Sequence, residues 1–210
     1  MEKLFCIFQE VCEINTVLPE SIDEKVALYE KHLQHPIVMT LEEYHEYSHS
    51  YQSHIEKARR CRDADAKHKI IRYELPAVCY SATLWNQTFG VSEAIKLRGY
   101  NSIVALDINK EQALEYMIFR LSSFDFVLYA GESADGKEII VLVLTDCPCP
   151  SSHKDYFLAL RSIFLGADLA VSDKGIDYMI LRPIGYSKGA YINFECTCFK
   201  LIKDNSETYD

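Results

Sequence analysis

The stretch SIVALDINK, residues 102–110, decides the expected fold. Its apolar run at positions 103–106 is typical of a buried strand, and Asp107, Ile108 and Asn109 follow directly. Because side chains alternate along a strand, Asp107 and Asn109 share one face. A strand that ends in an acid, a spacer and a second acid commonly holds a divalent metal, but here the second position is an amide. The stretch is therefore either a metal site that has lost a ligand or never was one.

Working outward from this strand, the patterns predict the order strand, helix, strand, strand, helix, strand. This is the order of the split β-α-β, ferredoxin-like unit, so we expect an α+β fold with two helices on one face of an antiparallel sheet. In the second helix, Ser152 is the expected cap and Gly166 the expected stop. The later elements are predicted at residues 110–123, 124–133, 137–146, 151–166, 167–172, 177–186 and 190–202.

Residues 1–100 are expected to form an α/β extension of this core, which covers residues 101–200, and 203–210 to form a polar tail that frays. The whole chain of 210 residues fits a single domain. The extension is predicted to contain strands at 4–11 and 77–85 and helices at 21–33, 40–61 and 62–75. Capping boxes support two of these helices, and their members are Ser21 with Glu24 and Thr40 with Glu43.

The chain is acidic, with 22 Lys and Arg against 31 Asp and Glu and a formal net charge of −9. An acidic protein is a poor bulk binder of nucleic acid, so such binding needs a local basic patch. One basic stretch fits, although Asp63 and Asp65 interrupt it and a solvated helix face is the alternative. Its phosphate-contacting candidates are Lys57, Arg59, Arg60, Arg62, Lys67, Lys69 and Arg72.

No apolar run reaches the ~18 residues of a membrane span, and the first residues lack the features of a signal peptide. We therefore expect a cytoplasmic protein with no membrane partner. In that compartment most of the 8 cysteines are expected to be small buried hydrophobes rather than disulfides.

Two patterns suggest zinc, and we judge zinc unlikely at both. HEYSH, residues 45–49, places His45 and His49 on one helix face with Glu46 as a candidate base, but its polar flanks and the lack of a downstream third ligand favour a solvated helix. DCPC and ECTC supply two C-x-C pairs, whereas the usual zinc spacing is C-x₂-C.

The expected hairpin GESADGK, residues 131–137, could bring backbone N–H groups and a lysine to a phosphate, although glycine and serine occur at any hairpin tip. A further acid, Asp168 or Asp173, flanks the strand candidate after the second helix. Clustered carboxylates that carry two Mg²⁺ ions are how polymerases align a nucleoside triphosphate.

Four stretches together resemble the primase-like N-terminal domain of the virulence-associated E proteins of Bacteroides-type bacteria, within the archaeo-eukaryotic primase superfamily. They span about residues 57 to 193 in the family's order. The stretches are HKIIRYELPAVCYSATLW, IVALDIN, YAGESADGKEIIVLV and SDKGIDYMILRPIGYSKGAYIN.

The resemblance implies a primase-polymerase palm that binds nucleic acid and a nucleoside triphosphate. It implies catalytic roles for Asp107, Asn109 and Asp173, with Mg²⁺ or Mn²⁺ held by Asp107 and Asp173. The residues that it assigns to the nucleotide are Ser133, Gly136, Lys137 and Arg182. The basic residues that we assign to nucleic acid are Arg59, Arg60, Arg62, Lys67 and Lys69.

The chain departs from the family's pattern at several positions. Asn109 replaces an acid, which removes a charge beside the metals, and GYSKG replaces Ser-Tyr-Asp-Pro. No helicase portion follows in this sequence, so a helicase partner on a separate chain is expected. Three hypotheses remain: a nucleotide- or nucleic-acid-binding domain with impaired nucleotidyl transfer, an active Mg²⁺- or Mn²⁺-dependent primase-polymerase, and a catalytically dead protein-interaction module.

Overall fold

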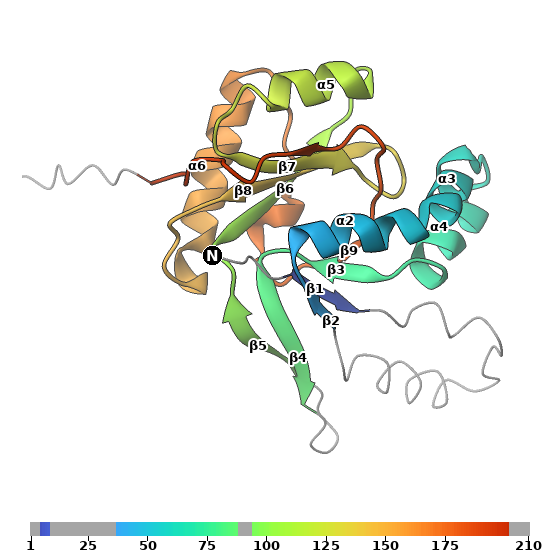
Figure 1. The fold of residues 1–210 in the computed structure, drawn as a ribbon, viewed down its shortest axis with the longest axis horizontal. Coiled ribbons are helices and arrows are strands. Elements are labelled where there is room, and N and C mark those ends of the chain that lie inside the picture. Colours follow the sequence, from blue (N-terminus) through green and yellow to red (C-terminus); the bar gives the residue numbers. More distant parts are fainter. Residues whose placement is uncertain (1–4, 9–36, 88–93, 202–210) are drawn as a thin grey trace, which may run out of the picture.

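The computed structural model describes residues 5–8, 37–87 and 94–201 (Figure 1). The helix expected at 21–33 and the tail expected at 203–210 lie outside the described residues. Within these ranges helices alternate with antiparallel strands, which confirms the α+β class. None of the helices in the described ranges is long and apolar enough to cross a membrane.

The central element, which we call the core sheet, consists of β6 (Ile103–Asn109), β7 (Val127–Glu132), β8 (Glu138–Leu144) and β10 (Tyr191–Ile192). Its antiparallel order is β10-β7-β8-β6. Strand β6 pairs with β8 along its whole length and ends with Asn109 opposite Glu138. Beyond β6 the sheet is extended by a single antiparallel bridge between Ile108 and Val171, where a strand was expected at 167–172.

The two faces of the core sheet pack against different layers. Helices α5 (Leu114–Leu121) and α6 (His153–Gly166) cover one face, which receives Val104, Leu106 and Ile108 of β6. The opposite face, with Ile103 and Ala105, packs against a second layer that includes α2 (Leu41–Ser50). Figure 1 shows α5 above the core sheet and α2 below it. Strand alternation therefore directs Asp107 into the second layer, away from α5 and α6.

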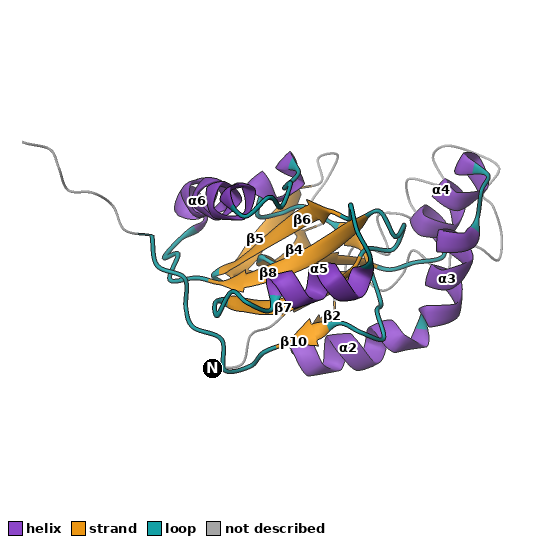
Figure 2. Cartoon of the chain, turned by 90° about the horizontal axis from the view of Figure 1, so that it is seen from above, coloured by secondary structure: helices purple, strands orange, loops and turns teal. Residues whose placement is uncertain are grey.

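The second layer joins α2 to α3 (Gln52–Arg60), α4 (Ala64–Tyr73) and a second sheet. That sheet has the order β2-β1-β3-β9 and comprises β1 (Phe5–Phe8), β2 (Ile37–Met39), β3 (Ala77–Cys79) and β9 (Arg182–Pro183). The predicted capping box of α2 is confirmed, because the Glu43 N–H donates to Thr40 Oγ1 at 3.2 Å and the Thr40 N–H to Glu43 Oε2 at 2.7 Å. The helix expected at 40–61 is two helices that meet at Tyr51, and α3 and α4 lie side by side at one end of the molecule (Figures 1 and 2).

Several details differ from the sequence-based expectations. Strands β4 (Ala82–Gln87) and β5 (Ala94–Tyr100) pair as a separate two-stranded sheet, and β5 was not predicted. The strand expected at 190–202 is reduced to β10 and a single bridge of Phe199 with Thr145. Helix α6 ends at Gly166 as predicted, but Ser152 makes no side-chain capping bond, and a short 3₁₀ helix, η3 (Pro150–Ser152), precedes α6 instead.

Candidate functional site

A buried ion pair joins the core sheet to the second sheet. The side chain of Asp107 on β6 is 2% exposed, and that of Arg182 on β9 is 6% exposed. Arg182 Nε donates to Oδ1 of Asp107 at 3.1 Å and to Oδ2 at 2.9 Å, while its Nη2 donates to Oδ2 at 2.5 Å. The same Nη2 reaches the carbonyl oxygen of Ala105 at 3.3 Å. Both oxygens of the predicted metal ligand are therefore held by a guanidinium.

The ion pair lines a cavity of about 320 Å³, which we call the central cavity. Its walls come from β6, the turn between β7 and β8, α4, and the segment around the short 3₁₀ helix η4 (Asp173–Ile176) and β9. Three residues assigned from the sequence, Asp107, Ser133 and Arg182, therefore line one cavity although they come from distant segments. The polar lining residues are His68, Asp107, Ser133, Asp135, Glu138, Lys174 and Arg182.

The hairpin turn beside this cavity is closed by its own hydrogen bonds. The Ser133 hydroxyl donates to Asp135 Oδ1 at 2.8 Å and accepts from the Glu138 N–H at 3.1 Å. The Lys137 N–H donates to Asp135 Oδ1 at 3.1 Å, and the Gly136 N–H to the Ser133 carbonyl at 3.1 Å. Gly136 has φ +76°, a conformation that favours glycine. Gly136 therefore shapes the turn, and the N–H groups of Gly136, Lys137 and Glu138 already have partners.

The same bonds set the charge of Asp135. Burial alone raises the pKa of this carboxyl group, but hydrogen bonds from the Lys137 N–H and the Ser133 hydroxyl outweigh it and lower the pKa below its ordinary value. Asp135 is therefore ionised at neutral pH and adds a negative charge to the central cavity.

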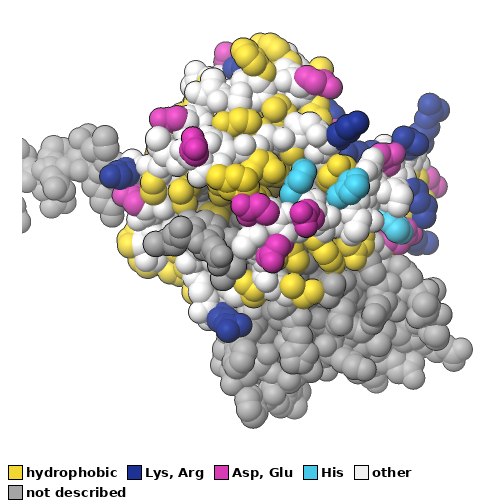
Figure 3. Space-filling model, in the orientation of Figure 1, with side chains coloured by type: hydrophobic (Ala, Val, Ile, Leu, Met, Phe, Trp, Pro, Cys, Tyr) yellow, Lys and Arg dark blue, Asp and Glu magenta, His cyan; other side chains and the backbone are white. Residues whose placement is uncertain are grey.

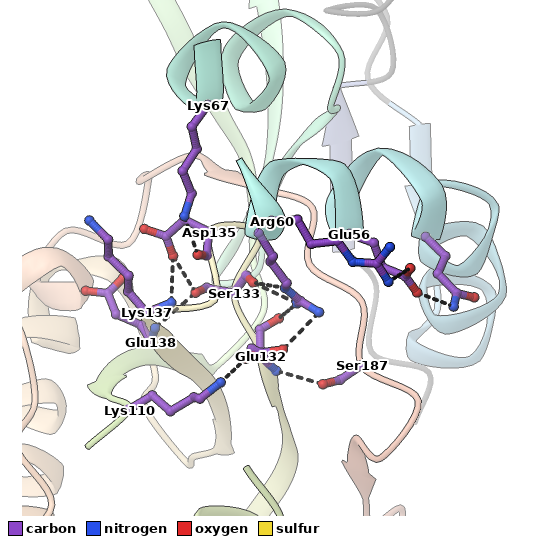
Figure 4. Close-up of polar contacts among 12 residues, drawn as sticks. Glu56, Arg60, Lys67, Lys110, Glu132, Ser133, Asp135, Lys137, Glu138 and Ser187 are labelled. Carbon is purple, nitrogen blue, oxygen red and sulfur yellow. Dashed lines mark hydrogen bonds and ion pairs between the residues drawn. The ribbon is translucent and has the colours of Figure 1, made fainter. Parts of the chain in front are cut away.

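Two residues of the predicted basic patch fasten the hairpin to the helices. Arg59 of α3 donates to the carbonyls of Glu132 and Ser133 at 3.0 and 2.8 Å, and its Nη1 lies 2.9 Å from Glu132 Oε2. Lys67 of α4 donates to the Asp135 carbonyl at 2.9 Å, and Lys110 forms a second ion pair with Glu132. Figure 4 shows Lys67 and Lys110 reaching the hairpin from opposite sides. Arg59 and Lys67 therefore hold the protein's own backbone, and their assignment to nucleic acid stays a prediction.

The remaining basic candidates lie at the surface. The side chain of Arg60 is 80% exposed and pairs with Glu56 one turn earlier, and Arg62 and Lys69 are exposed. Lys57 and Arg72 are exposed as well, so these five residues are the members of the predicted patch that are placed to meet a phosphate.

The predicted acids do not gather around Asp107. Asp173 is 73% exposed and pairs with Arg161 of α6, the helix that covers the face of the core sheet opposite to Asp107. Asp168, the alternative third acid, is exposed in a left-handed turn after α6 with φ 52°. Asn109 is exposed at the end of β6, where its N–H donates to the Ala170 carbonyl. Of the two predicted metal ligands, Asp107 and Asp173, Asp107 alone lines the central cavity.

This arrangement does not fit a two-metal centre. Such centres need carboxylates that converge on ions about 4 Å apart, and both oxygens of Asp107 are engaged by Arg182. Across residues 5–8, 37–87 and 94–201, no group of three or more His, Cys, Asp and Glu side chains is placed to hold a metal ion.

The HEYSH segment packs on an aromatic side chain. The rings of His45 and His49 lie 5.8 and 5.0 Å from the ring of Tyr186, measured between centroids. Figure 3 shows histidine side chains on this face with acidic side chains beside them. Ring packing therefore accounts for the spacing of the two histidines.

The cysteines of the two C-x-C pairs differ in exposure. Cys147 is buried, whereas Cys198 is exposed. Hydrogen bonding to the Ser151 and Ser152 hydroxyls lowers the pKa of Cys149. In the described residues these thiols form no metal-binding group of three or more.

Several lining residues of the central cavity were not singled out in the sequence. Glu138 accepts from Lys174 Nζ at 2.7 and 2.6 Å, which brings a second ion pair to the cavity. Glu138 lies opposite Asn109 in the register of β6 and β8, so the predicted hairpin could have indicated it. Lys174 and His68 carry no comparable local signal, because their positions depend on how η4 and α4 pack.

A buried histidine supports η4. Gly175 packs so closely on β6 that a Cβ atom there would collide with the Ala105 carbonyl. His153 Nε2 lies 3.1 Å from the Gly175 carbonyl, and Nδ1 lies 2.8 Å from the Tyr100 hydroxyl. Since a carbonyl only accepts, the neutral ring donates from Nε2 and accepts at Nδ1. Burial lowers the pKa of His153, although the bond to the Gly175 carbonyl opposes this shift.

We expect this histidine to make stability depend on pH. The unfolded chain takes up a proton near pH 6.5, whereas folded His153 resists it, so stability is lost as pH falls below that value. The free energy of unfolding, measured by urea denaturation, should decrease when the pH is lowered from 7.5 to 5.5. This decrease should be larger in the wild type than in His153→Gln. His54→Gln, at an exposed position of α3, serves as the matched control and should keep the full dependence. An identical pH dependence in wild type and His153→Gln would contradict the assignment.

Comparison of the chain with protein-family models, curated proteins and solved structures finds no match in any of the three. The resemblance to primase-like domains is therefore carried by the sequence motifs alone. The structure defines a broader class: an α+β domain with a small, charged cavity between the core sheet and the second sheet.

Proposed function

We propose that this chain is a primase-like domain of a mobile-element or replication module that binds nucleotides or nucleic acid and in which metal-dependent nucleotidyl transfer is impaired. One observation carries the proposal: Arg182 holds both oxygens of Asp107, the carboxylate that would have to hold the metal. A metal ion that took Asp107 would leave a buried guanidinium without its partner, which is energetically costly.

The binding part of the proposal is supported by the central cavity. Its volume of about 320 Å³ falls at the lower end of the ~300–1,000 Å³ typical of small-molecule sites. It also receives Ser133 and Arg182, two of the residues that the family resemblance assigns to the nucleotide. A cytoplasmic location and a helicase partner on a separate chain belong to the same proposal.

Two measurements test it. Primer synthesis from labelled nucleotides with Mg²⁺ or Mn²⁺ should give no product above the background of a blank. Nucleoside monophosphates should bind in ligand-observed NMR or calorimetry, and His68→Trp should weaken that binding at least tenfold by narrowing the cavity. His54→Trp provides the control, because His54 is exposed on α3 and does not line the cavity.

Primer products that disappear in Asp107→Asn would replace this proposal with an active primase-polymerase. If no nucleotide binds, or if His68→Trp and His54→Trp behave alike, the binding part fails.

A second candidate function, a catalytically dead protein-interaction module, is favoured by one surface feature. Phe119 and Tyr116 of α5 are 74% and 47% exposed. Phe119 borders a cavity of about 520 Å³ between α3 and α5, and exposed aromatic side chains beside a cavity are typical of protein-binding surfaces. Absence of nucleotide binding would favour this candidate.

A further inference from the structure

The charges of the central cavity are unfavourable for a triphosphate. Three carboxylates line it, those of Asp107, Asp135 and Glu138, against two cations. Both cations already have partners, since Arg182 is held by Asp107 and Lys174 by Glu138. The third carboxylate, Asp135, lies near Lys67 and Lys137, which help to lower its pKa. An incoming polyanion could therefore gain a cation of the cavity lining only by breaking an existing pair.

Part of the hairpin backbone beside the cavity is also unavailable to a phosphate. A phosphate-binding turn needs N–H groups that point at the ligand. Here the N–H groups of Gly136, Lys137 and Glu138 donate within the hairpin, to the Ser133 carbonyl, the Asp135 carboxylate and the Ser133 hydroxyl respectively. Anchoring of the hairpin by Arg59 and Lys67 holds this closed arrangement in place.

The cavity nevertheless offers a hydrogen-bond acceptor beside an apolar wall. Among the described residues, both hydrogen bonds to the Asp135 carboxylate fall on Oδ1, which leaves Oδ2 to accept from a ligand. The apolar wall is formed by Ile71, Ile140, Ile180, Leu181 and Pro183. A flat, weakly polar ring that carries N–H donors matches both features, and every nucleobase is such a ring.

We infer that the central cavity binds the nucleobase and sugar of a nucleotide and does not bind its triphosphate. This inference rests on the nucleotide-binding function proposed above. The ligand class is a nucleoside, either free or as an unpaired residue of a single strand, whose base donates to Asp135 Oδ2. This reverses the role expected for the hairpin, which becomes an acceptor of base N–H groups instead of a phosphate cradle.

Calorimetry without divalent metal tests the inference with four nucleosides, their 5′-triphosphates and a mixed-sequence hexanucleotide. The best nucleoside should bind at least tenfold more tightly than its own triphosphate.

Asp135→Asn should reduce this preference at least tenfold, because it removes both the charge repulsion toward the triphosphate and an ionised acceptor for the base. Glu138→Gln, which frees Lys174, should shift the preference in the same direction and remains informative if Asp135→Asn does not fold. Tighter binding of the hexanucleotide than of any nucleoside would identify the single strand as the source of the base.

A triphosphate that binds more tightly than its nucleoside overturns the inference while leaving the nucleotide-binding function intact. An unchanged preference in both folded variants also overturns it. Absence of binding by nucleosides, triphosphates and the hexanucleotide overturns the proposed function itself.

Discussion

Arg182→Ala is expected to lower the free energy of unfolding by about 3–5 kcal/mol, because it leaves a buried carboxylate without a compensating charge. Asp107 is 2% exposed, and Arg182 supplies three hydrogen bonds to its two oxygens. The same side chain donates to the Ala105 carbonyl, so the variant also removes a link between the two sheets. Urea denaturation followed by circular dichroism measures the change.

The control replaces both members of the pair. The double variant Asp107→Leu with Arg182→Met removes the buried charges together, and well-packed apolar replacements of buried ion pairs are often neutral or stabilising. We therefore expect it to be more stable than Arg182→Ala alone. A loss below about 1 kcal/mol for Arg182→Ala, the value of an exposed ion pair, would show that the two side chains do not form a buried pair.

Arg59→Ala should lower the free energy of unfolding by about 2–3 kcal/mol, since hydrogen bonds to charged groups contribute roughly 1.5–3 kcal/mol each and Lys110 still compensates Glu132. Arg59 is 20% exposed and holds the carbonyls of Glu132 and Ser133 as well as the Glu132 carboxylate. Thermal and urea denaturation both measure this change.

Arg60 is the matched control for Arg59. It is the next residue of the same helix, is 80% exposed, and pairs only with Glu56 in the described part of the chain. Arg60→Ala should therefore change stability by less than about 0.5 kcal/mol. Equal losses for the two variants would mean that Arg59 does not fasten the hairpin.

Local signals predicted much of the fold. The capping box of Thr40 and Glu43 and the apolar run of β6 depend on residues near one another in the chain, and the structure contains both. Strand β5 was missed because Lys96, Arg98 and Gly99 interrupt its apolar pattern, and its pairing with β4 is its main support.

The candidate site was only partly predictable, because its chemistry depends on contacts between distant segments. Asp107 was identified from a strand pattern, but its partner Arg182 is 75 positions later, and no local signal couples them. Asp173 follows a residue that pairs with β6, yet the turn into η4 directs its side chain to Arg161 of α6. Likewise, Arg59 and Arg60 are indistinguishable in the sequence, and only packing makes one structural and the other solvated.

Binding of Mn²⁺, followed by electron paramagnetic resonance in the wild type, Asn109→Asp and Asp107→Asn, tests the central claim that Arg182 rather than a metal holds Asp107. The wild type and Asn109→Asp should each bind no more Mn²⁺ than Asp107→Asn does. An acid at position 109, at the exposed end of β6, does not release Asp107 from the guanidinium of Arg182. One bound Mn²⁺ per chain in the wild type that is lost in Asp107→Asn would contradict the account and restore the metal-dependent enzyme.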